Sequence, residues 1–361
     1  MNRVLIRVDI SDKIGGGHLM RMIGLGQLLA VHGCEVHIAS AFYKPNFIEP
    51  LLDSSFHLHL FGKGDEFQVE SDLSELLSLA NELEPEWIIL DGYHFPGGYE
   101  KAIRLADFRC MRVDDMPVQR CEADVFLNHN YGSELFKYDL ADHTIKLTGL
   151  KHLLIRRQFR NLDLSTKRYA KPGEIRLLVS LGGGSEITDA MNLKIVEALS
   201  QIKGMFGKAT IVAGKMGKIS EELVKASRES EFPIAIAQYS ENMAEMMLDS
   251  DIAITAGGYS MWELLYMGTP FIALSLNKAQ EAYTRYLAQE GICGILGLYD
   301  GVSPDHIKET LLSFVNDEAR LNMIKQKVGL LIDRENNGQS LLNILTNKKT
   351  IFTTQITKKY E

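Results

Sequence analysis

The chain contains two copies of one pattern, an apolar run rich in Val, Leu and Ile that leads into three consecutive glycines. The first run, Val4–Val8, precedes Gly15–Gly17, and the second, Ile175–Ser180, precedes Gly182–Gly184. A strand that ends in a glycine-rich turn and continues into a helix begins a βαβ unit. The repeat therefore predicts an α/β fold with two Rossmann-like domains that face a cleft, where ligands bind at the carboxyl ends of the strands.

A chain of 361 residues also exceeds the ~250–300 residues at which a single core stops growing. Short β-branched runs alternate with helical patterns along most of it, as stacked βαβ units require. Helices are predicted at Leu19–Val31, Leu73–Leu83 and Ala190–Gln201. Further strands are predicted at Glu35–Ala39, Trp87–Leu90, Cys110–Val113, Val125–Leu127, Ala209–Val212, Ile252–Thr255 and Phe271–Leu274.

The periodic pattern lapses between residues 163 and 174, where the sequence is polar and contains Pro172-Gly173. Such a segment is typical of an interdomain linker. We therefore expect an N-terminal domain at 1–162 and a C-terminal domain at 175–345. Residues 346–361 are expected to form a basic, partly disordered tail.

Charge and composition exclude several classes of protein. The formal net charge of −8 argues against nucleic-acid binding, because phosphate backbones require dense Lys and Arg. No window reaches the ~18 consecutive apolar residues of a membrane helix, and the short apolar run before Asp9 does not resemble a signal peptide. The four scattered cysteines are interpreted as reduced thiols. We expect a cytoplasmic protein without membrane insertion, whose oligomeric state the sequence does not indicate.

The first glycine loop is followed directly by a histidine. Gly15, Gly16 and Gly17 allow the backbone to approach a ligand closely, and the helix that begins there favours anions. His18 suits general-base chemistry, because an imidazole titrates near neutral pH. A tight turn capped by a histidine is the alternative. Three nearby charged residues either orient the imidazole, bind a phosphate or form surface ion pairs: Arg7, Asp9 and Arg21.

Two apolar strands end in acidic residues. Asp91 and Tyr93 follow the strand at 87–90, and Asp114-Asp115 follow the strand at 110–113. Adjacent residues of a strand point to opposite faces, so we expect one of the two adjacent carboxylates to reach the site. These acids either tune His18 or bind substrate hydroxyls. Tyr93 is either a site residue or a packed aromatic with its hydroxyl in water.

The second domain carries its own glycine-rich turns. Gly183 and Gly184 offer backbone N–H groups, or form only a turn. Gly257, Gly258 and Ser260 lie between a strand and a helix, where N–H groups and the helix dipole suit a diphosphate. Glu263, about one turn further, suits the ribose hydroxyls, but Ser260-x-x-Glu263 also fits a capping box that needs no ligand.

Other polar residues are weaker candidates. Asn277 and Gln280 follow a late strand and either read a base or a sugar, or are solvated. His57 and His59 share one face of a strand, but no third ligand is evident, so we predict no metal site. No motif indicates a cofactor.

The run from Arg7 to Arg21 fits the pattern R-x-D-x-S-x-x-I-G-x-G-H-x-x-R at every fixed position. It resembles the opening of the UDP-2,4-diacetamido-2,4,6-trideoxy-β-L-altropyranose hydrolases of pseudaminic acid biosynthesis. The resemblance continues to about residue 300 through Asp91–Tyr93, Val113–Asp115, Leu127-Asn128, Leu154–Phe159, Ser180–Gly183 and Gly257–Glu263.

The resemblance implies a glycosyltransferase-B-like fold and a metal-independent hydrolase that releases UDP from an amino- or deoxysugar. It implies that His18 activates water, that Tyr93 lies near the sugar, and that UDP sits mainly on the C-terminal domain. It assigns the diphosphate to Gly257, Gly258 and Ser260 and the ribose to Glu263. A glycosyltransferase acting on a nucleotide-sugar donor and a noncatalytic nucleotide-sugar binding protein are the alternatives.

The sequence departs from the family pattern at three places. Gly184-Ser185-Glu186 stands where the family has an Asp after the two glycines, and Tyr259 replaces a small residue. The adjacent Asn-Gln of the family is split here into Asn277 and Gln280. These positions are expected to contact nucleotide and sugar, so the sugar or the base is expected to differ.

Overall fold

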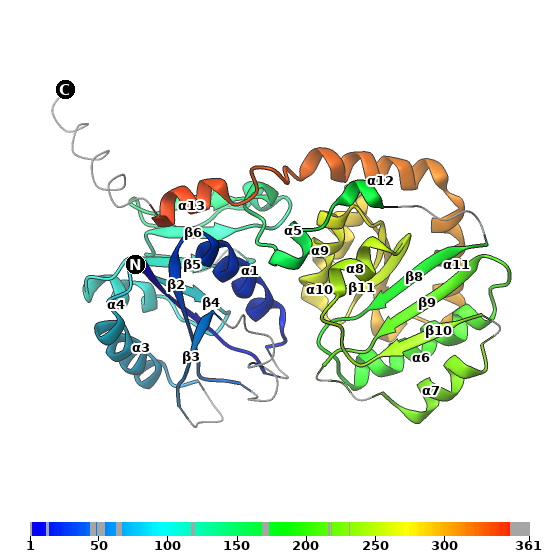
Figure 1. Ribbon diagram of the computed structural model, residues 1–361, viewed down its shortest axis with the longest axis horizontal. Helices are drawn as coiled ribbons and strands as arrows, with labels where there is room; N and C mark the ends of the chain where they lie inside the picture. Colours follow the sequence, from blue (N-terminus) through cyan, green and yellow to red (C-terminus); the bar gives the residue numbers. More distant parts are fainter. Residues whose placement is uncertain are drawn as a thin grey trace. The chain divides into compact units, whose positions relative to one another are not determined.

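The chain forms two parallel β-sheets, each accompanied by helices (Figure 1). The computed structural model describes residues 2–11, 14–43, 48, 55–62, 67–116, 120–167, 173–215, 217, 219–230 and 232–346. It divides into two units. Unit 1 contains residues 2–11, His18–Arg156 and the chain from Asp333 onward, and unit 2 contains residues 14–17 and Arg157–Ile332.

Unit 1 has a seven-stranded sheet in the order β3-β2-β1-β4-β5-β6-β7, with neighbouring strands parallel. Its helices include α1 (Gly17–Val31), α3 (Val69–Leu83), α4 (Tyr99–Leu105) and α13 (Gln339–Thr346). The strands are β1 (Asn2–Val8), β2 (Cys34–Ser40), β3 (Phe56–Leu60), β4 (Trp87–Asp91), β5 (Cys110–Val113), β6 (Val125–Asn128) and β7 (Ile145–Thr148).

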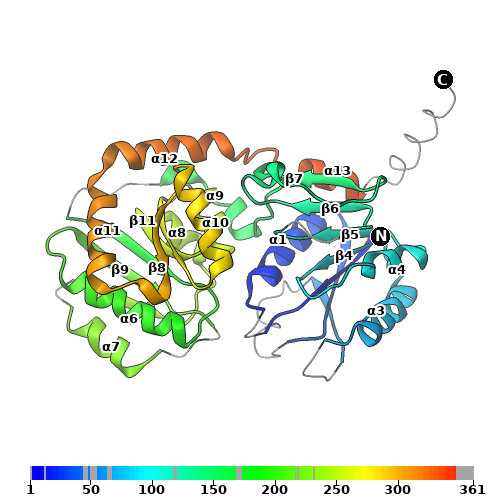
Figure 2. The same cartoon turned by 180° about the vertical axis from the view of Figure 1, so that it is seen from behind.

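Unit 2 has a six-stranded parallel sheet in the order β10-β9-β8-β11-β12-β13. Helices α6, α7 and α11 lie side by side in Figure 2. The strands are β8 (Ile175–Ser180), β9 (Phe206–Val212), β10 (Ile234–Ala237), β11 (Ile252–Ala256), β12 (Phe271–Ser275) and β13 (Gly294–Leu298). The helices are α5 (Arg157–Arg160), α6 (Glu186–Ser200), α7 (Glu221–Arg228), α8 (Met243–Leu248), α9 (Ser260–Met267), α10 (Lys278–Gln289), α11 (Pro304–Asn316) and α12 (Glu318–Leu331).

The winding of each sheet reverses once. In unit 1 the chain runs outward from β1 to β3 and then outward from β4 to β7, so the reversal lies between β1 and β4. In unit 2 the reversal lies between β8 and β11 for the same reason. Open parallel sheets bind their ligands beyond the carboxyl ends of the strands at such a reversal. The prediction of two parallel-sheet α/β domains is confirmed, and the strand order places a candidate site in each unit.

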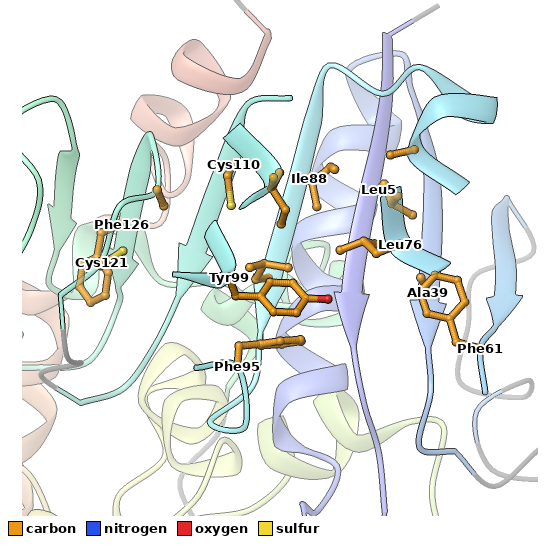
Figure 3. Close-up of a cluster of buried hydrophobic side chains, with 14 residues drawn as sticks. Leu5, Ala39, Phe61, Leu76, Ile88, Phe95, Tyr99, Cys110, Cys121 and Phe126 are labelled. Carbon is orange, nitrogen blue, oxygen red and sulfur yellow. The ribbon is translucent and has the colours of Figure 1, made fainter. Parts of the chain in front are cut away.

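A buried apolar cluster covers one face of the unit 1 sheet (Figure 3). Leu5 and Ile88 from neighbouring strands pack with Leu76 of α3 and Tyr99 of α4. Cys121 belongs to the same cluster, where burial raises the pKa of its thiol to about 12. All four cysteines are buried and free, in keeping with the reduced thiols expected from the sequence.

The C-terminal helix α13 belongs to unit 1, although residues 175–345 were assigned to a single C-terminal domain. Leu341 and Leu345 of this helix are buried, and the Ser340 hydroxyl lies 3.0 Å from Nδ1 of His152. The helix follows unit 2 in the sequence but packs in unit 1, where its leucines are buried. Unit 2 likewise begins at Arg157, before the predicted linker.

Two segments predicted from the sequence lie partly outside the described residues. The parts that lie outside are residues 168–172 of the predicted linker at 163–174 and residues 347–361 of the predicted tail at 346–361. Within the described part of the chain, no helix is both long and apolar enough to cross a membrane.

Candidate active site

Charged side chains gather at the carboxyl ends of β4 and β5 in unit 1. Gly15 adopts a left-handed backbone (φ +77°) just before α1, and Gly17 is the first residue of that helix. His18 and Arg21 therefore lie in the first turn and a half of α1. Both side chains are buried, and both turn toward Asp91, the last residue of β4.

His18 and Asp91 form a buried pair. Nδ1 of His18 lies 2.7 Å from Oδ1 of Asp91, whose side chain has no exposed surface. Nη2 of Arg21 also lies 3.0 Å from Nδ1 of His18, but it donates to Oδ1 of Asp91 over the shorter distance of 2.5 Å. A carboxylate only accepts hydrogen bonds, so the His18 ring donates to Asp91 through Nδ1. In the neutral ring this leaves the lone pair on Nε2. The arrangement is that of a histidine oriented by an acid, with the second ring nitrogen available as a base.

Arg21 holds two carboxylates at once. Its Nε and Nη2 donate to Asp91 at 2.6 and 2.5 Å, a bidentate pairing, and its Nη1 donates to Asp115. Burial, the largest single influence, raises the pKa of both acids, but the Arg21 charge, the neighbouring His18 and the hydrogen bonds together outweigh it and hold both pKa values below their usual range. Asp91 and Asp115 are therefore ionised at neutral pH.

Asp115 in turn positions Tyr93. The Tyr93 hydroxyl donates to Oδ2 of Asp115 at 2.5 Å, and Nδ2 of Asn130 donates to Oδ1 at 3.0 Å. The Tyr93 ring meets the His18 ring edge to face, with centroids 4.6 Å apart. Desolvation and the Asp115 charge raise the pKa of Tyr93, so the phenol stays protonated. Tyr93 is 62% exposed, which leaves its ring open to a ligand beside His18.

The two adjacent acids separate as expected. Asp115 faces Arg21, whereas Asp114 accepts from Arg112 at 2.9 Å within a different buried group that includes Glu100. Burial raises the pKa of Asp114 despite Arg112. The structure thus ranks the acids that the sequence left unranked: Asp91 contacts His18 directly, and Asp115 lies one step further along the network.

Arg7 and Asp9 lie in a separate network. The Arg7 guanidinium donates to Asp9 and to Asp72 at 2.5 Å each, and Asp9 also accepts from the backbone N–H groups of Ala41 and Phe42. Arg7 has no exposed surface and Asp9 is 1% exposed. These two residues tie β1 to α3 and to the turn after β2. Neither is a surface ion pair, and neither presents a free group to a substrate.

In unit 2, the first glycine turn is explained largely by packing. Gly182 and Gly184 have left-handed backbones (φ +94° and +96°), and a side chain on Gly184 would meet the backbone of Gly217 at 2.3 Å. Gly183 lies between them. Ser185 then caps α6 in a capping box with Thr188. The serine that departs from the family pattern thus has a structural role.

The second glycine turn, after β11, is less fully explained. The N–H group of Gly257 donates to the carbonyl of Leu274 at 3.0 Å, and that of Gly258 donates to the carbonyl of Ala256 at 2.8 Å. These two N–H groups are therefore already engaged, whereas the sequence predicted that they would bind a diphosphate. A side chain on Gly257 would meet Gln280 and Thr284 within 3 Å, whereas one on Gly258 would meet nothing within 4 Å. Gly257 is required for packing, and Gly258 is not.

Helix α9 starts without a side-chain cap. Tyr259 is its N-cap and forms no cap bond, and Ser260 is already its first helical residue, so the predicted Ser260-x-x-Glu263 capping box is not formed. Met261 and Trp262 donate to carbonyls of the preceding turn. The N–H of Ser260 is one of the four that an α-helix leaves without an intrahelical partner. Glu263 is 2% exposed, so its carboxylate is not open at the surface.

Asn277 and Gln280 form the cap of α10. Oδ1 of Asn277 accepts from the N–H of Gln280 at 2.9 Å, and Oε1 of Gln280 accepts from the N–H of Leu276 at 2.9 Å. Both carbonyl oxygens are thus engaged, which leaves the amide NH₂ groups for any ligand. The split spacing that departs from the family pattern is the spacing of a capping box.

Sequence reasoning missed two sets of residues. Asn130 donates a hydrogen bond to Asp115 and was not predicted as a site residue. The one indication in the sequence was its position just after β6, the strand that neighbours β5. The structure also brings Glu35 and His37 of β2 to His57, so the pair His57 and His59 does have neighbours of metal-ligand type. Their spacing along the chain gave no indication of this.

The two parallel sheets and their reversal points define an α/β protein of glycosyltransferase-B-like fold. Solved structures share this fold. An Acinetobacter baumannii MurG structure has a TM-score of 0.67 at 16% identity, covering 95% of this chain and 99% of its own. The spinosyn forosaminyltransferase SpnP has a TM-score of 0.62 at 14% identity, covering 96% and 100%. Residues 178–336 match the glycosyltransferase family 28 C-terminal domain.

Similar sequences cover most of this chain. The uncharacterized protein MJ1062 of Methanocaldococcus jannaschii is 26% identical over 79% of this chain, but the chain spans only 58% of that protein. The spore coat polysaccharide biosynthesis protein SpsG of Bacillus subtilis is 25% identical over 85% of this chain and 86% of its own length. The UDP-2,4-diacetamido-2,4,6-trideoxy-β-L-altropyranose hydrolase of Campylobacter jejuni is 24% identical over 80% and 97%.

The opposite pKa shifts of Asp115 and Asp114 predict opposite effects on acid stability. The stability that Asp115 contributes is complete above its unfolded pKa of about 3.9 and is lost as pH falls through its lower folded pKa. Asp115→Asn should therefore lose less unfolding free energy than wild type between about pH 6 and pH 3. Asp114, whose folded pKa is raised, supplies the matched control: Asp114→Asn should lose as much as wild type, or more.

Urea unfolding at the two pH values measures this difference. An Asp115→Asn variant that is as acid-sensitive as wild type would show that Arg21 does not hold Asp115 ionised.

Proposed function

We propose that this chain transfers a sugar from a nucleotide-sugar donor to an acceptor hydroxyl, with His18 as the general base. The observation that carries the proposal is the His18–Asp91 pair at the reversal point of the unit 1 sheet. The coarser conclusion, an enzyme that acts on nucleotide sugars, rests on the family 28 match and the shared fold. Glycosyltransferases among the solved structures of this fold favour transfer over hydrolysis.

In the proposed reaction, the acceptor oxygen attacks the anomeric carbon while the bond from that carbon to the diphosphate oxygen breaks. The diphosphate leaves with the electron pair. Nε2 of His18 takes the proton from the attacking hydroxyl and the ring becomes an imidazolium. The Asp91 carboxylate, 2.7 Å from Nδ1, stabilises that charge, and Arg21 keeps Asp91 ionised. Tyr93, protonated and exposed beside His18, donates a hydrogen bond or packs against the sugar.

The nucleotide is assigned to unit 2. Support comes from the family 28 match at residues 178–336 and from the uncapped start of α9, where the Ser260 N–H and the helix dipole suit a diphosphate. Gly258 adds to this support, because neither its backbone angle nor its packing requires a glycine. Where neither packing nor the backbone angle requires a glycine, the absence of a side chain can instead allow a ligand to approach the backbone closely. The name of the Campylobacter relative contains UDP, so uracil is the base that we propose for the nucleotide.

Hydrolysis is the second candidate, and the same site serves it with water as the nucleophile. Two observations favour it: the full Arg7–Arg21 pattern, and a hydrolase relative of which this chain covers 97%. His18 would then deprotonate water, and the products would be the free sugar and UDP. A binding protein without turnover is the third possibility that the experiment must separate.

The test is UDP release from a panel of UDP-sugars, with and without sugar and lipid-linked acceptors, in water labelled with oxygen-18. Transfer predicts release that depends on the acceptor, with no label in the products. His18→Asn and Asp91→Asn should each slow release by about 10²- to 10⁴-fold, the usual contribution of a general base. His32→Asn is the matched control, because His32 is an exposed histidine just after the same helix.

Each other outcome is distinct. Release without an acceptor, with label in the sugar, would replace transfer by hydrolysis, and label in the phosphate would place the attack on phosphorus. Tight binding of UDP-sugars without any release would support the binding protein. An undiminished rate in folded His18→Asn would reject His18 as the base in both reactions.

Gly258→Ala tests the diphosphate site. Since an added methyl group meets no protein atom within 4 Å, the variant should fold with an unchanged melting temperature. If UDP lies against the backbone here, the methyl group occupies its space, and the dissociation constant of UDP should rise about 10-fold or more, the equivalent of one charge-assisted hydrogen bond. Isothermal titration with UDP measures the change.

Gly301→Ala is the control, because a side chain there also meets nothing within 4 Å. Unchanged UDP affinity in Gly258→Ala would move the diphosphate away from this turn.

A further inference from the structure

Four side chains of the types that bind metal ions lie on one face of strands β2 and β3. Glu35 and His37 are two residues apart on β2, and His57 and His59 are two residues apart on β3. Residues two apart on a strand share a face. The parallel register pairs His37 with His57 and Ala39 with His59, so the two pairs lie side by side. Glu35 and His57 lie near the amino ends of their strands, whereas Asp91, the partner of His18, is the last residue of β4.

The spacing of three of these side chains matches a tetrahedral metal site. Oε1 of Glu35 lies 3.5 Å from Nε2 of His37 and 3.4 Å from Nε2 of His57. One ligand atom from each of the three residues lies within 4.8 Å of the others. Two ligand atoms bound to zinc at about 2.0–2.1 Å with a tetrahedral angle are about 3.3 Å apart. The His37 and His57 rings are stacked with centroids 4.7 Å apart, so the exposed His57 ring has to turn for its lone pair and that of His37 to meet at one ion.

The buried nitrogen of His37 supports a ligand at this point. Nε2 of His37 is buried and makes no hydrogen bond in the structure, and His37 as a whole is 4% exposed. A buried polar atom without a hydrogen-bond partner costs free energy. Coordination to a cation would satisfy it, since Nε2 faces the Glu35 carboxylate across the gap.

The surroundings hold these ligands in place. Nδ1 of His37 and Nε2 of His59 lie 2.9 Å apart, and when Nδ1 donates, the lone pair of His37 is on Nε2. Nε of Arg3 donates to Oε2 of Glu35 at 3.0 Å, which leaves Oε1 to face the histidines. Supporting hydrogen bonds of this kind fix the tautomer of a metal-ligating histidine and the orientation of a carboxylate.

We propose that Glu35, His37 and His57 bind a Zn²⁺ ion that ties the edge strand β3 to β2. Two imidazoles and one carboxylate are a ligand set that zinc takes, and the fourth position is left for water. His59 and Arg3 are positioning residues. The site is separate from the His18 network and does not depend on the proposed function. The sequence predicted no metal site because no third ligand was evident beside His57 and His59, and the structure brings Glu35 and His37 of the neighbouring strand to His57.

The experiment is Zn²⁺ titration of the full chain after removal of metals with a chelator, followed by isothermal titration calorimetry and by melting temperature. We expect one Zn²⁺ per chain, with a higher melting temperature when it is bound. His57→Ala and Glu35→Gln should each weaken binding at least 10-fold, the lower end of the effect of losing even a supporting group. Co²⁺ in place of Zn²⁺ should give the visible absorption of a tetrahedral site.

His57 suits substitution because its side chain is 55% exposed, so His57→Ala should fold like wild type. His32→Ala, which removes an exposed histidine outside the cluster, should bind Zn²⁺ like wild type. Equal Zn²⁺ affinity in wild type, His57→Ala and Glu35→Gln would overturn the proposal, and so would the absence of Zn²⁺ binding to the wild-type chain.

Discussion

The pairing of Arg21 with Asp91 is the interaction on which the rest of the unit 1 site depends. Asp91 is completely buried, and a buried carboxylate without a cation would take up a proton instead of staying charged. Arg21 supplies the cation through two hydrogen bonds and also reaches Asp115. The ionised Asp91 orients His18, and the ionised Asp115 orients Tyr93 and Asn130. Removing one partner of such a buried pair typically costs about 3–5 kcal/mol, so Arg21 supports both the fold and the chemistry.

Much of the fold could be predicted from the sequence because central parallel strands are buried on both faces and therefore appear as unbroken apolar runs. Strand β1 and strands β4 to β6 were found in this way. The bounds of the edge strand β3 were not predicted, although His57 and His59 were expected to share a strand face, because these two polar residues among five interrupt the apolar run. The return of α13 to unit 1 depends on which surface accepts its leucines, and no local pattern encodes that choice.

The candidate site could likewise be predicted only in part from the sequence. His18, Arg21, Asp91 and Tyr93 could be placed together because the carboxyl ends of neighbouring parallel strands meet at one edge. Which acid contacts His18 depends on side-chain directions that only the structure supplies. Arg7 and Asp9 belong to the same sequence pattern, yet they stabilise β1 from within. In unit 2, Gly257, Asn277 and Gln280 have packing or capping roles, whereas Gly258 and Ser260 have none that the described residues reveal.

Asp91 holds His18 in the tautomer that carries its proton on Nδ1 and its lone pair on Nε2. Nitrogen-15 NMR of the histidine-labelled chain, at a pH where the His18 ring is neutral, tests this most directly. We expect the chemical shift of a protonated nitrogen at Nδ1 and of an unprotonated nitrogen at Nε2, with that preference lost in Asp91→Asn. A proton on Nε2 in the wild-type chain, or the same tautomer in both proteins, would contradict it.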